Sequence, residues 1–165
     1  WAAVGVVSFG LGKYLGKADD VIDLYHGTSR EAAQAIRDGG IDLSKSRAGL
    51  DFGAGFYATT DFRQAQKWAA SRFGDSADIL HFRVPASELS KFRTLNFDRA
   101  DNLWESFVQW NRAAKGSHGY DVVNGAMLGN PGAFARGARA SAWGQQTSFH
   151  TQSVIDFLNG SLMGN

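Results

Sequence analysis

The chain contains the stretch Val21-Ile22-Asp23-Leu24-Tyr25-His26-Gly27-Thr28-Ser29, from which the start of the fold can be derived. The apolar and β-branched residues Val21 to Tyr25 predict a strand, and His26-Gly27-Thr28 predicts a turn at its end. Ser29 or Thr28 has a side chain suited to cap a helix, which we expect over Arg30 to Arg37. A strand, a turn and a helix therefore follow one another here.

A second informative stretch is Asp51-Phe52-Gly53-Ala54-Gly55-Phe56-Tyr57-Ala58-Thr59-Thr60-Asp61. Its glycines predict a loop, and the apolar residues after Gly55 predict a short strand. Asp61 has the side chain of a helix cap, so we expect a helix over Phe62 to Phe73 that ends at Gly74.

The rest of the chain contains further short elements. We expect strands at Ile79 to Val84, Tyr120 to Val123 and Gln146 to His150, a loop at Gly129 to Trp143, and helices at Pro85 to Leu89, from Asp101 to about Ala114, and at Gln152 to Leu158. Short strands interrupted by helices, without strict alternation, predict an α+β fold rather than a doubly wound parallel sheet. We assign residues 21–165 to one such domain.

Composition limits the classes of function. With 165 residues, 44% of them hydrophobic, and two prolines, the chain is suited to a single domain with a buried core. A formal net charge of +1 gives no dominant field, so a nucleic-acid partner needs a local basic patch. The absence of cysteine excludes disulfides, cysteine nucleophiles and thiolate metal sites. The four histidines lack the spacing of a zinc site, so we expect no metal.

The first residues are apolar. The run Trp1 to Leu11 is followed by Lys13 and Lys17, but it is too short to span a bilayer and lacks the n-region of a signal peptide. We interpret residues 1–20 as a linker or the remnant of a longer parent chain; the alternative is a segment used in membrane passage. We expect a monomer without stable membrane association.

Three pieces of the sequence resemble a known family. They are Tyr25-His26-Gly27-Thr28, the segment Gly53 to Asp61 followed by Trp68, and Gln146-Thr147-Ser148-Phe149. In this order they resemble the His-Tyr-Glu branch of the ADP-ribosyltransferases, which includes diphtheria toxin and the poly(ADP-ribose) polymerases. The resemblance runs from about Val21 to Leu158, without motifs at 82–119. It implies two small, twisted β-sheets around a cleft that binds NAD+, with flanking helices.

The resemblance also implies roles for individual residues. His26 matches the histidine that hydrogen-bonds a ribose hydroxyl of NAD+, and the adjoining Gly27 and Thr28 belong to the same binding segment. The backbone of Gly27 would hold the nicotinamide carboxamide, because a residue without Cβ lets a ligand approach the main chain. Tyr57 and Trp68 match the two aromatic residues that sandwich the nicotinamide ring. The structural alternatives are a satisfied buried histidine at His26 and core packing at Tyr57 and Trp68.

At one position the sequence departs from the family. Gln146 falls where the family has its catalytic glutamate, which holds the ribose 2'-hydroxyl and stabilises the cation formed as nicotinamide leaves. A glutamine oxygen still accepts that hydrogen bond, but loss of the charge slows the reaction by up to about three orders of magnitude unless it is replaced. Asp51 and Asp121 are candidates for the replacement; alternatively, the acceptor brings the negative charge itself, and Asp51 is only a loop cap.

The loop at Gly129 to Trp143 lies where the family recognises its target. Arg136 and Arg139 suit a phosphate-bearing partner, and Trp143 is able to stack on a base. The alternative is that both arginines are solvated and that Trp143 anchors the loop.

The resemblance implies an NAD-dependent ADP-ribosyltransferase that breaks the nicotinamide–ribose bond and transfers ADP-ribose to RNA or protein. The endings of C-terminal toxin domains in bacterial polymorphic (Rhs-type) effectors are similar to Gln-Thr-Ser-Phe-His-Thr at 146–151. We therefore expect a secreted antibacterial effector that acts in the target cell's cytoplasm and has a cognate immunity protein. Two alternatives remain open: an NAD+ glycohydrolase, and a non-catalytic module that binds NAD+, ADP-ribose or nucleic acid.

Overall fold

The computed structural model describes residues 20–164, so the segment assigned to a linker or remnant lies, apart from Asp20, outside the described residues. The strands are β1 (Val21–Ser29), β2 (Phe56–Ala58), β3 (Ala77–Pro85), β4 (Thr94–Asn96), β5 (Val122–Leu128) and β6 (Ala142–Phe149). The helices are α1 (Arg30–Gly39), α2 (Phe62–Phe73), α3 (Ala86–Leu89), α4 (Asn102–Arg112), α5 (Pro131–Ala135) and α6 (Gln152–Asn159), with 3-10 turns at Leu43–Lys45 and Gly74–Ser76.

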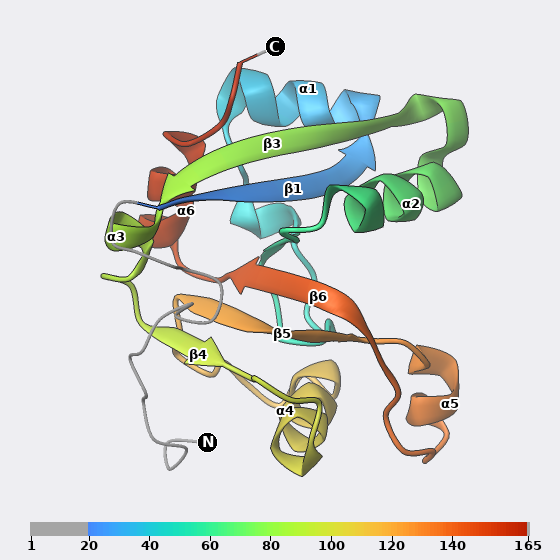
Figure 1. Ribbon diagram of the computed structural model, residues 1–165. Helices are drawn as coiled ribbons and strands as arrows, with labels where there is room; N and C mark the ends of the chain where they lie inside the picture. The colour runs from blue at the N-terminus through green and yellow to red at the C-terminus, as the bar shows by residue number, and fades with distance from the viewer. Residues whose placement is uncertain (1–19, 165) are drawn as a thin grey trace.

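The strands form two sheets, and the expected α+β class is confirmed. β1 and β3 make an antiparallel two-stranded sheet, and the second sheet has the order β2-β6-β5-β4. Only β4 and β5 run parallel in the second sheet. Figure 1 shows the β1–β3 pair above the four-stranded sheet, with α1 and α2 beside the former and α4 below the latter.

The helices α1 and α2 begin where the sequence predicts. The Ser29 hydroxyl accepts a hydrogen bond from the backbone N–H of Ala32, and the Asp61 carboxylate accepts from the N–H groups of Arg63 and Gln64. These bonds satisfy donors that have no partner within a helix. Gly40 and Gly74 end the two helices at positive φ angles of 83° and 52°, which glycine adopts without strain.

Two strands extend further than predicted. The expected turn at His26-Gly27-Thr28 is wrong, because β1 continues to Ser29 and pairs with β3 along its whole length. β5 covers Val122–Leu128 rather than Tyr120 to Val123, since it lies between β4 and β6 and receives ladder hydrogen bonds from both. The predicted 129–143 loop contains helix α5 and the first residues of β6.

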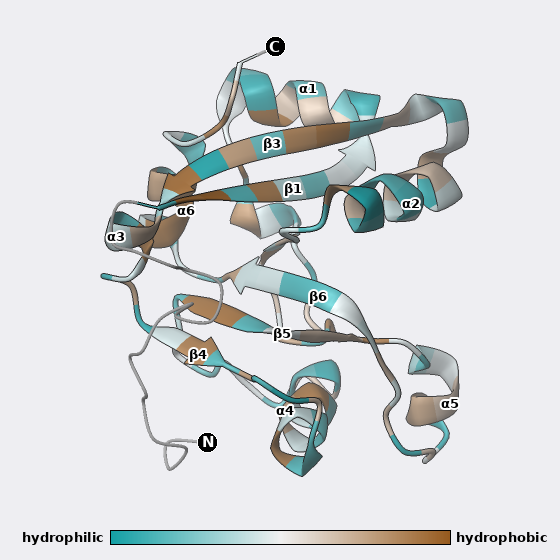
Figure 2. Cartoon of the chain, in the orientation of Figure 1, coloured by the Kyte–Doolittle hydropathy of each residue, from teal (hydrophilic) through white to brown (hydrophobic). Residues whose placement is uncertain are grey.

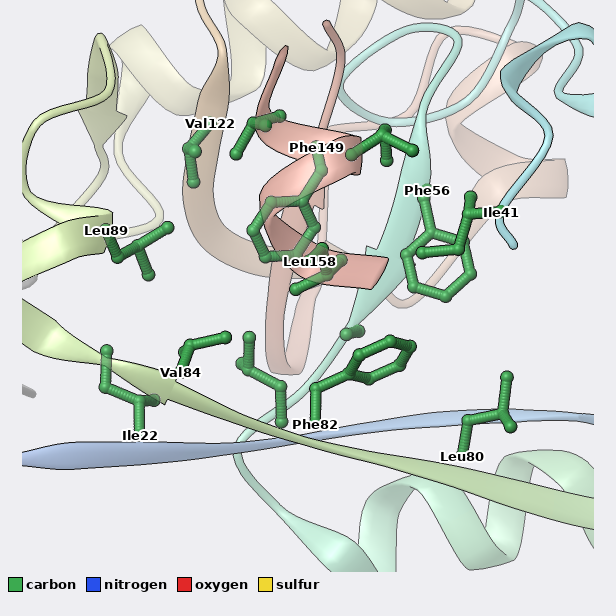
Figure 3. Close-up of a cluster of buried hydrophobic side chains, with 14 of the residues drawn as sticks. Ile22, Ile41, Phe56, Leu80, Phe82, Val84, Leu89, Val122, Phe149 and Leu158 are labelled. Atoms are coloured by element: carbon green, nitrogen blue, oxygen red, sulfur yellow. The ribbon is translucent and has the colours of Figure 1, made fainter. Parts of the chain in front are cut away.

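Two groups of buried side chains hold the layers together. The first lies between the two sheets and α6, and Figure 3 shows Phe56, Phe149 and Leu158 facing Phe82 and Val84. The second lies between the four-stranded sheet and α4 and contains Phe52, Leu95, Trp104, Phe107, Val108, Tyr120, Val123 and Leu128. In Figure 2 parts of β1, β3 and α6 are brown, which marks the hydrophobic residues of these elements. Burial of this apolar surface fixes the position of one sheet against the other.

Among the described residues, no helix combines the length and the apolar character that crossing a membrane requires.

Candidate functional site

A cavity of about 720 Å³ lies between the end of β1, helices α1 and α2, and the segment that leads into β2. Its volume falls within the range of roughly 300–1,000 Å³ typical of ligand pockets. The predicted site residues that line it are His26, Gly27, Thr28, Asp51, Tyr57, Trp68 and Gln146. These residues come from β1, the glycine-containing loop, β2, α2 and β6, so the fold brings together segments that are distant in the sequence.

The two sheets are joined directly beside this cavity. Tyr25 of β1 and Thr59 exchange two backbone hydrogen bonds, with N···O distances of 2.7 and 2.9 Å. The side-chain amide of Gln64 in α2 pairs with the backbone of Gln145 in β6: its Nε2 donates to the carbonyl oxygen at 2.6 Å, and its Oε1 accepts from the N–H at 2.9 Å. Gln64 therefore holds the helix that carries Trp68 against the strand that carries Gln146.

His26 presents a hydrogen-bond acceptor to the cavity. Its Nδ1 lies 2.5 Å from the carbonyl oxygen of Tyr57, and since a carbonyl only accepts, Nδ1 is the donor. The imidazole stacks on the ring of Phe56, with 4.2 Å between ring centroids. Burial lowers the pKa of His26, so the ring is neutral at pH 7 and its Nε2 carries a free lone pair.

The hydroxyl of Tyr57 is used within the protein. It donates to the carbonyl oxygen of Gly53 at 2.6 Å and accepts from the backbone N–H of Phe52 at 3.0 Å. Burial raises the pKa of Tyr57, which keeps the phenol protonated. Tyr57 therefore offers the cavity an aromatic ring in a fixed orientation rather than an acid or a base.

Trp68 is partly buried at the cavity wall and belongs to neither described core cluster. The guanidinium of Arg72, one helical turn further on, lies 5.1 Å from the centroid of its ring. Phe73 contacts the same indole edge-on at 6.0 Å. The indole is thus supported by its own helix while lining the cavity.

Gly27 is required for a reason that the sequence did not indicate. A Cβ at this position would lie 2.6 Å from the carbonyl oxygen of Ala65 and 3.0 Å from the Cβ of Ala69. Helix α2 therefore packs directly on the backbone of β1. The same backbone lines the cavity.

Gln146 is connected to a buried ion pair. Its Nε2 donates to Oδ2 of Asp51 at 3.0 Å and to the carbonyl oxygen of Ala126 at 3.3 Å. Both partners only accept, so the amide orientation is determined, and Oε1 has no donor partner among the described residues. Asp51 also accepts from the N–H of Leu128 at 2.8 Å and from Arg112 at 2.7 Å. Arg112 was not predicted, because no local pattern connects residues 61 positions apart.

The second acid candidate, Asp121, lies elsewhere. Its carboxylate accepts from the backbone N–H of Arg93 at 2.8 Å and from the Thr151 hydroxyl at 2.6 Å. Asp121 is not among the residues that line the cavity. Of the two acids, only Asp51 contacts Gln146.

The predicted target-recognition residues lie outside the cavity lining. Arg139 forms an ion pair with Glu105 at 2.9 Å and donates to Oδ1 of Asn102 at 2.7 Å. The pKa of Glu105 is lowered by hydrogen bonds from the backbone N–H of Ala140 and from Arg139. Arg136 is exposed, and Trp143 is 47% exposed. Only Pro131, at the start of this segment, reaches the cavity wall.

Cationic side chains outnumber acidic ones around the cavity. The cations are Lys45, Arg47, Arg72 and Arg112, and the acids are Asp42 and Asp51. Arg112 is bound to Asp51, whereas Lys45 and Arg47 are exposed at the edge of the cavity. The site therefore favours an anionic ligand. No cluster of three or more histidine and carboxylate side chains among residues 20–164 is arranged to hold a metal ion.

Comparison with protein families identifies the chain as a family member. Residues 22–131 match the model of a family described as proteins of unknown function, DUF3990. This match covers more than half of the chain, which therefore belongs to the DUF3990 family. It includes His26, Asp51, Tyr57, Trp68 and Arg112, and it ends before Gln146. A comparison with curated proteins finds no match.

Proposed function

We propose that this member of the DUF3990 family has an ADP-ribosyltransferase fold and binds NAD+ in the cavity beside the two sheets. It breaks the nicotinamide–ribose bond and transfers ADP-ribose to a macromolecule. The observation that carries the proposal is the convergence of His26, Tyr57, Trp68 and Gln146 on one cavity of suitable volume. The resemblance in the sequence implies a role for each of these residues in one NAD+ site, and they are up to 120 positions apart in the chain.

The aromatic side chains support a nicotinamide subsite. Oxidised nicotinamide is a flat ring with a positive charge, and aromatic faces attract such rings by stacking and cation–π contact. Tyr57 is suited to this because its hydroxyl is held by Phe52 and Gly53. Trp68 supplies the second ring, and the backbone of Gly27 supplies polar groups for the carboxamide.

Two acceptors support a ribose subsite. The Nε2 of His26 and the Oε1 of Gln146 both have free lone pairs, which suit hydroxyl donors. Bond cleavage leaves the electron pair of the glycosidic bond on nicotinamide, which departs neutral, and the ribose becomes an oxocarbenium-like cation. The acceptor then attacks C1' and loses its proton. His26 and Gln146 stabilise that cation through their dipoles and hold its hydroxyls.

The cationic edge supports a diphosphate subsite. Lys45, Arg47 and Arg72 line the cavity on the side of the 3-10 turn and helix α2. Their charge complements the two negative charges of the dinucleotide linkage. This property separates a dinucleotide from nicotinamide riboside, which has the same reacting bond without phosphates.

The acceptor is RNA or protein in this proposal. The segment 129–143 begins at the cavity wall with Pro131 and extends to the exposed Arg136 and Trp143. An exposed arginine and an exposed indole suit phosphates and unstacked bases. We further propose that the domain is the toxic part of a bacterial secreted effector, acts in the target cell's cytoplasm and is inhibited by a cognate immunity protein.

One observation favours a second candidate, a module that binds NAD+ without cleaving it. The carboxylate closest to Gln146 is that of Asp51, and it already forms an ion pair with Arg112. No uncompensated carboxylate among the described residues lining the cavity lies beside Gln146. Binding by the aromatic and cationic residues needs no such charge, so turnover distinguishes the two functions.

The test is incubation of the domain with NAD+ labelled in the adenylate part and a bacterial lysate. Protein, RNA, DNA and free ADP-ribose are then separated, with Tyr57→Ala as the control variant. Label on RNA or protein that is absent from the control supports the transferase. Free ADP-ribose alone indicates a glycohydrolase, in which water is the acceptor. Intact NAD+ together with measurable NAD+ binding indicates the non-catalytic module.

A further inference from the structure

We propose that Arg112 and Asp51 are positioning residues that hold Gln146 with its carbonyl oxygen toward the cavity, so that the site requires an amide, not a carboxylate, at position 146. The catalytic consequence rests on the proposed NAD+ cleavage; the structural requirement does not. Restoring the glutamate of the resembling family is therefore expected to damage this protein.

The three residues form a linear hydrogen-bonded chain. Arg112, the last residue of α4, donates to Oδ1 of Asp51 at 2.7 Å, and the other oxygen of Asp51 accepts from Gln146 at 3.0 Å. The side chain of Asp51 is 11% exposed and Gln146 is 6% exposed, so little water competes with these bonds. The chain ties the loop before β2 to a helix and a strand from other parts of the sequence.

The surroundings of Gln146 select for an amide. Its Nε2 faces two acceptors, the Asp51 carboxylate and the carbonyl oxygen of Ala126 at 3.3 Å. A carboxylate in this position would bring an oxygen against both acceptors, and two buried carboxylates in contact disfavour each other's ionisation. Turning the glutamate carboxylate over does not relieve this contact, because either of its two oxygens would face the same acceptors.

The same arrangement makes Oε1 of Gln146 a stronger hydrogen-bond acceptor. The negative charge of Asp51 lies behind the amide nitrogen and polarises the group, which increases the electron density on Oε1. Because Arg112 compensates the charge of Asp51, the effect on the ribose comes from the polarised amide of Gln146 and not from an uncompensated carboxylate. Arg112 fixes the position of Asp51, which makes it a positioning residue although it also lines the cavity.

The experiment compares wild type, Gln146→Glu, Asp51→Asn and the double variant in kcat and KM for nicotinamide release. Gln146→Glu is expected to lower kcat by about tenfold to a hundredfold, with a smaller change in KM, because the group that contacts ribose is displaced. In the Asp51→Asn background the same change is expected to cost less, because position 51 then carries no second negative charge beside the new carboxylate. Gln145→Glu makes the same substitution at the adjacent residue of β6 and serves as the matched control.

Thermal unfolding of the same variants tests the requirement without activity. Gln146→Glu is expected to lower Tm by at least about 4 °C, and less when Asp51 is replaced by asparagine. Gln146→Met removes the donor and the acceptor but adds no charge, so it should lower Tm less than Gln146→Glu. This comparison keeps the test valid if Asp51→Asn does not fold.

The outcomes separate the two proposals. Wild-type kcat and Tm in Gln146→Glu, or an equal loss in both Asp51 backgrounds, would overturn the positioning role. Wild type without nicotinamide release, but with the expected pattern of Tm values, overturns the proposed function and leaves the amide requirement supported.

Discussion

The two glycine-containing loops of this protein look alike in sequence and differ in how they are held. The first, Asp51 to Gly55, forms a wall of the cavity. Its backbone is bonded by side chains from distant segments: His118 donates to the carbonyl oxygen of Phe52 at 2.8 Å, and His150 donates to that of Ala54 at 2.7 Å. Ser46 binds both the N–H and the carbonyl oxygen of Gly55.

The second loop, 129–141, contains Phe134, which packs against the core beside α4, and polar contacts near its two ends hold the rest. Asn130 donates to the carbonyl oxygen of Arg139 and accepts from the N–H of Ser141, which closes the segment on itself. Glu105 of α4 binds Arg139 and the N–H of Ala140. Both loops contain glycine, but more side chains from distant segments bind the backbone of the first. We expect a rigid wall for NAD+ and an adaptable surface for the acceptor.

The largest effect is expected from Tyr57, the side chain of β2 that both lines the cavity and hydrogen-bonds the backbone of the first loop. Tyr57→Ala removes the ring and both hydrogen bonds to the loop, so nicotinamide release should fall by about a hundredfold or more. Tyr57→Phe keeps the ring and loses only the hydroxyl bonds, which should lower the free energy of unfolding by about 1–3 kcal/mol. Its loss of activity should be far smaller than that of Tyr57→Ala. Steady-state kinetics and thermal unfolding measure the two effects.

Equal losses of activity in Tyr57→Ala and Tyr57→Phe would contradict this account. They would show that the hydroxyl takes part in the reaction, not only in holding the loop.

Acid should loosen the first loop and leave the second unaffected. Burial, followed by the proximity of His118, lowers the pKa of His150 to about 4 from 6.5. Between pH 6.5 and 4 the unfolded chain gains a proton on this group while the folded chain does not, so stability falls as pH falls through that window. The loss is up to about 3 kcal/mol and ends below pH 4, where both states are protonated.

Hydrogen exchange of the two loops at pH 7 and pH 5, corrected for the intrinsic exchange rate, measures this difference. The variant His150→Gln should reduce the pH dependence of unfolding between pH 6.5 and 4, and the part that remains is expected from His26 and His118, whose pKa values burial also lowers. Equal acid sensitivity in both loops would contradict the comparison, since residues 129–143 contain no histidine.

The smallest effect on nicotinamide release is expected from a substitution in the second loop. Arg136→Ala should change nicotinamide release by less than about twofold, because this exposed side chain is not part of the cavity lining. Transfer to a macromolecule should fall more, since phosphate contacts position a nucleic acid. Parallel assays of nicotinamide release and label transfer decide this, and an equal loss in both would place Arg136 at the NAD+ site.

Local signals predicted much of the fold. Ser29, Asp61, Gly40 and Gly74 determine the ends of α1 and α2 through hydrogen bonds and φ angles within a few residues. The bounds of β1 and β5 were missed because the partner strand, not the local sequence, decides where a strand ends. Short β4 was missed for the same reason.

The sequence likewise predicted some residues of the candidate site and missed others. His26, Tyr57 and Trp68 occur in motifs, whereas Arg112, His118 and His150 act through contacts that only the folded chain creates. The sequence suggested Asp51 as an acid near Gln146, but it gave no sign of the other partners of Asp51, Arg112 and Leu128. Side chains that hold other side chains leave no periodic pattern in a single sequence.

We propose that the cavity between β1, α2 and β6 breaks the nicotinamide–ribose bond of NAD+. The most direct measurement is release of nicotinamide from NAD+ labelled in the nicotinamide ring, with lysate present as a source of acceptor. We predict release by wild type and loss of release in Tyr57→Ala, with both proteins folded. The absence of release from folded wild type, or equal release from both proteins, would contradict the claim.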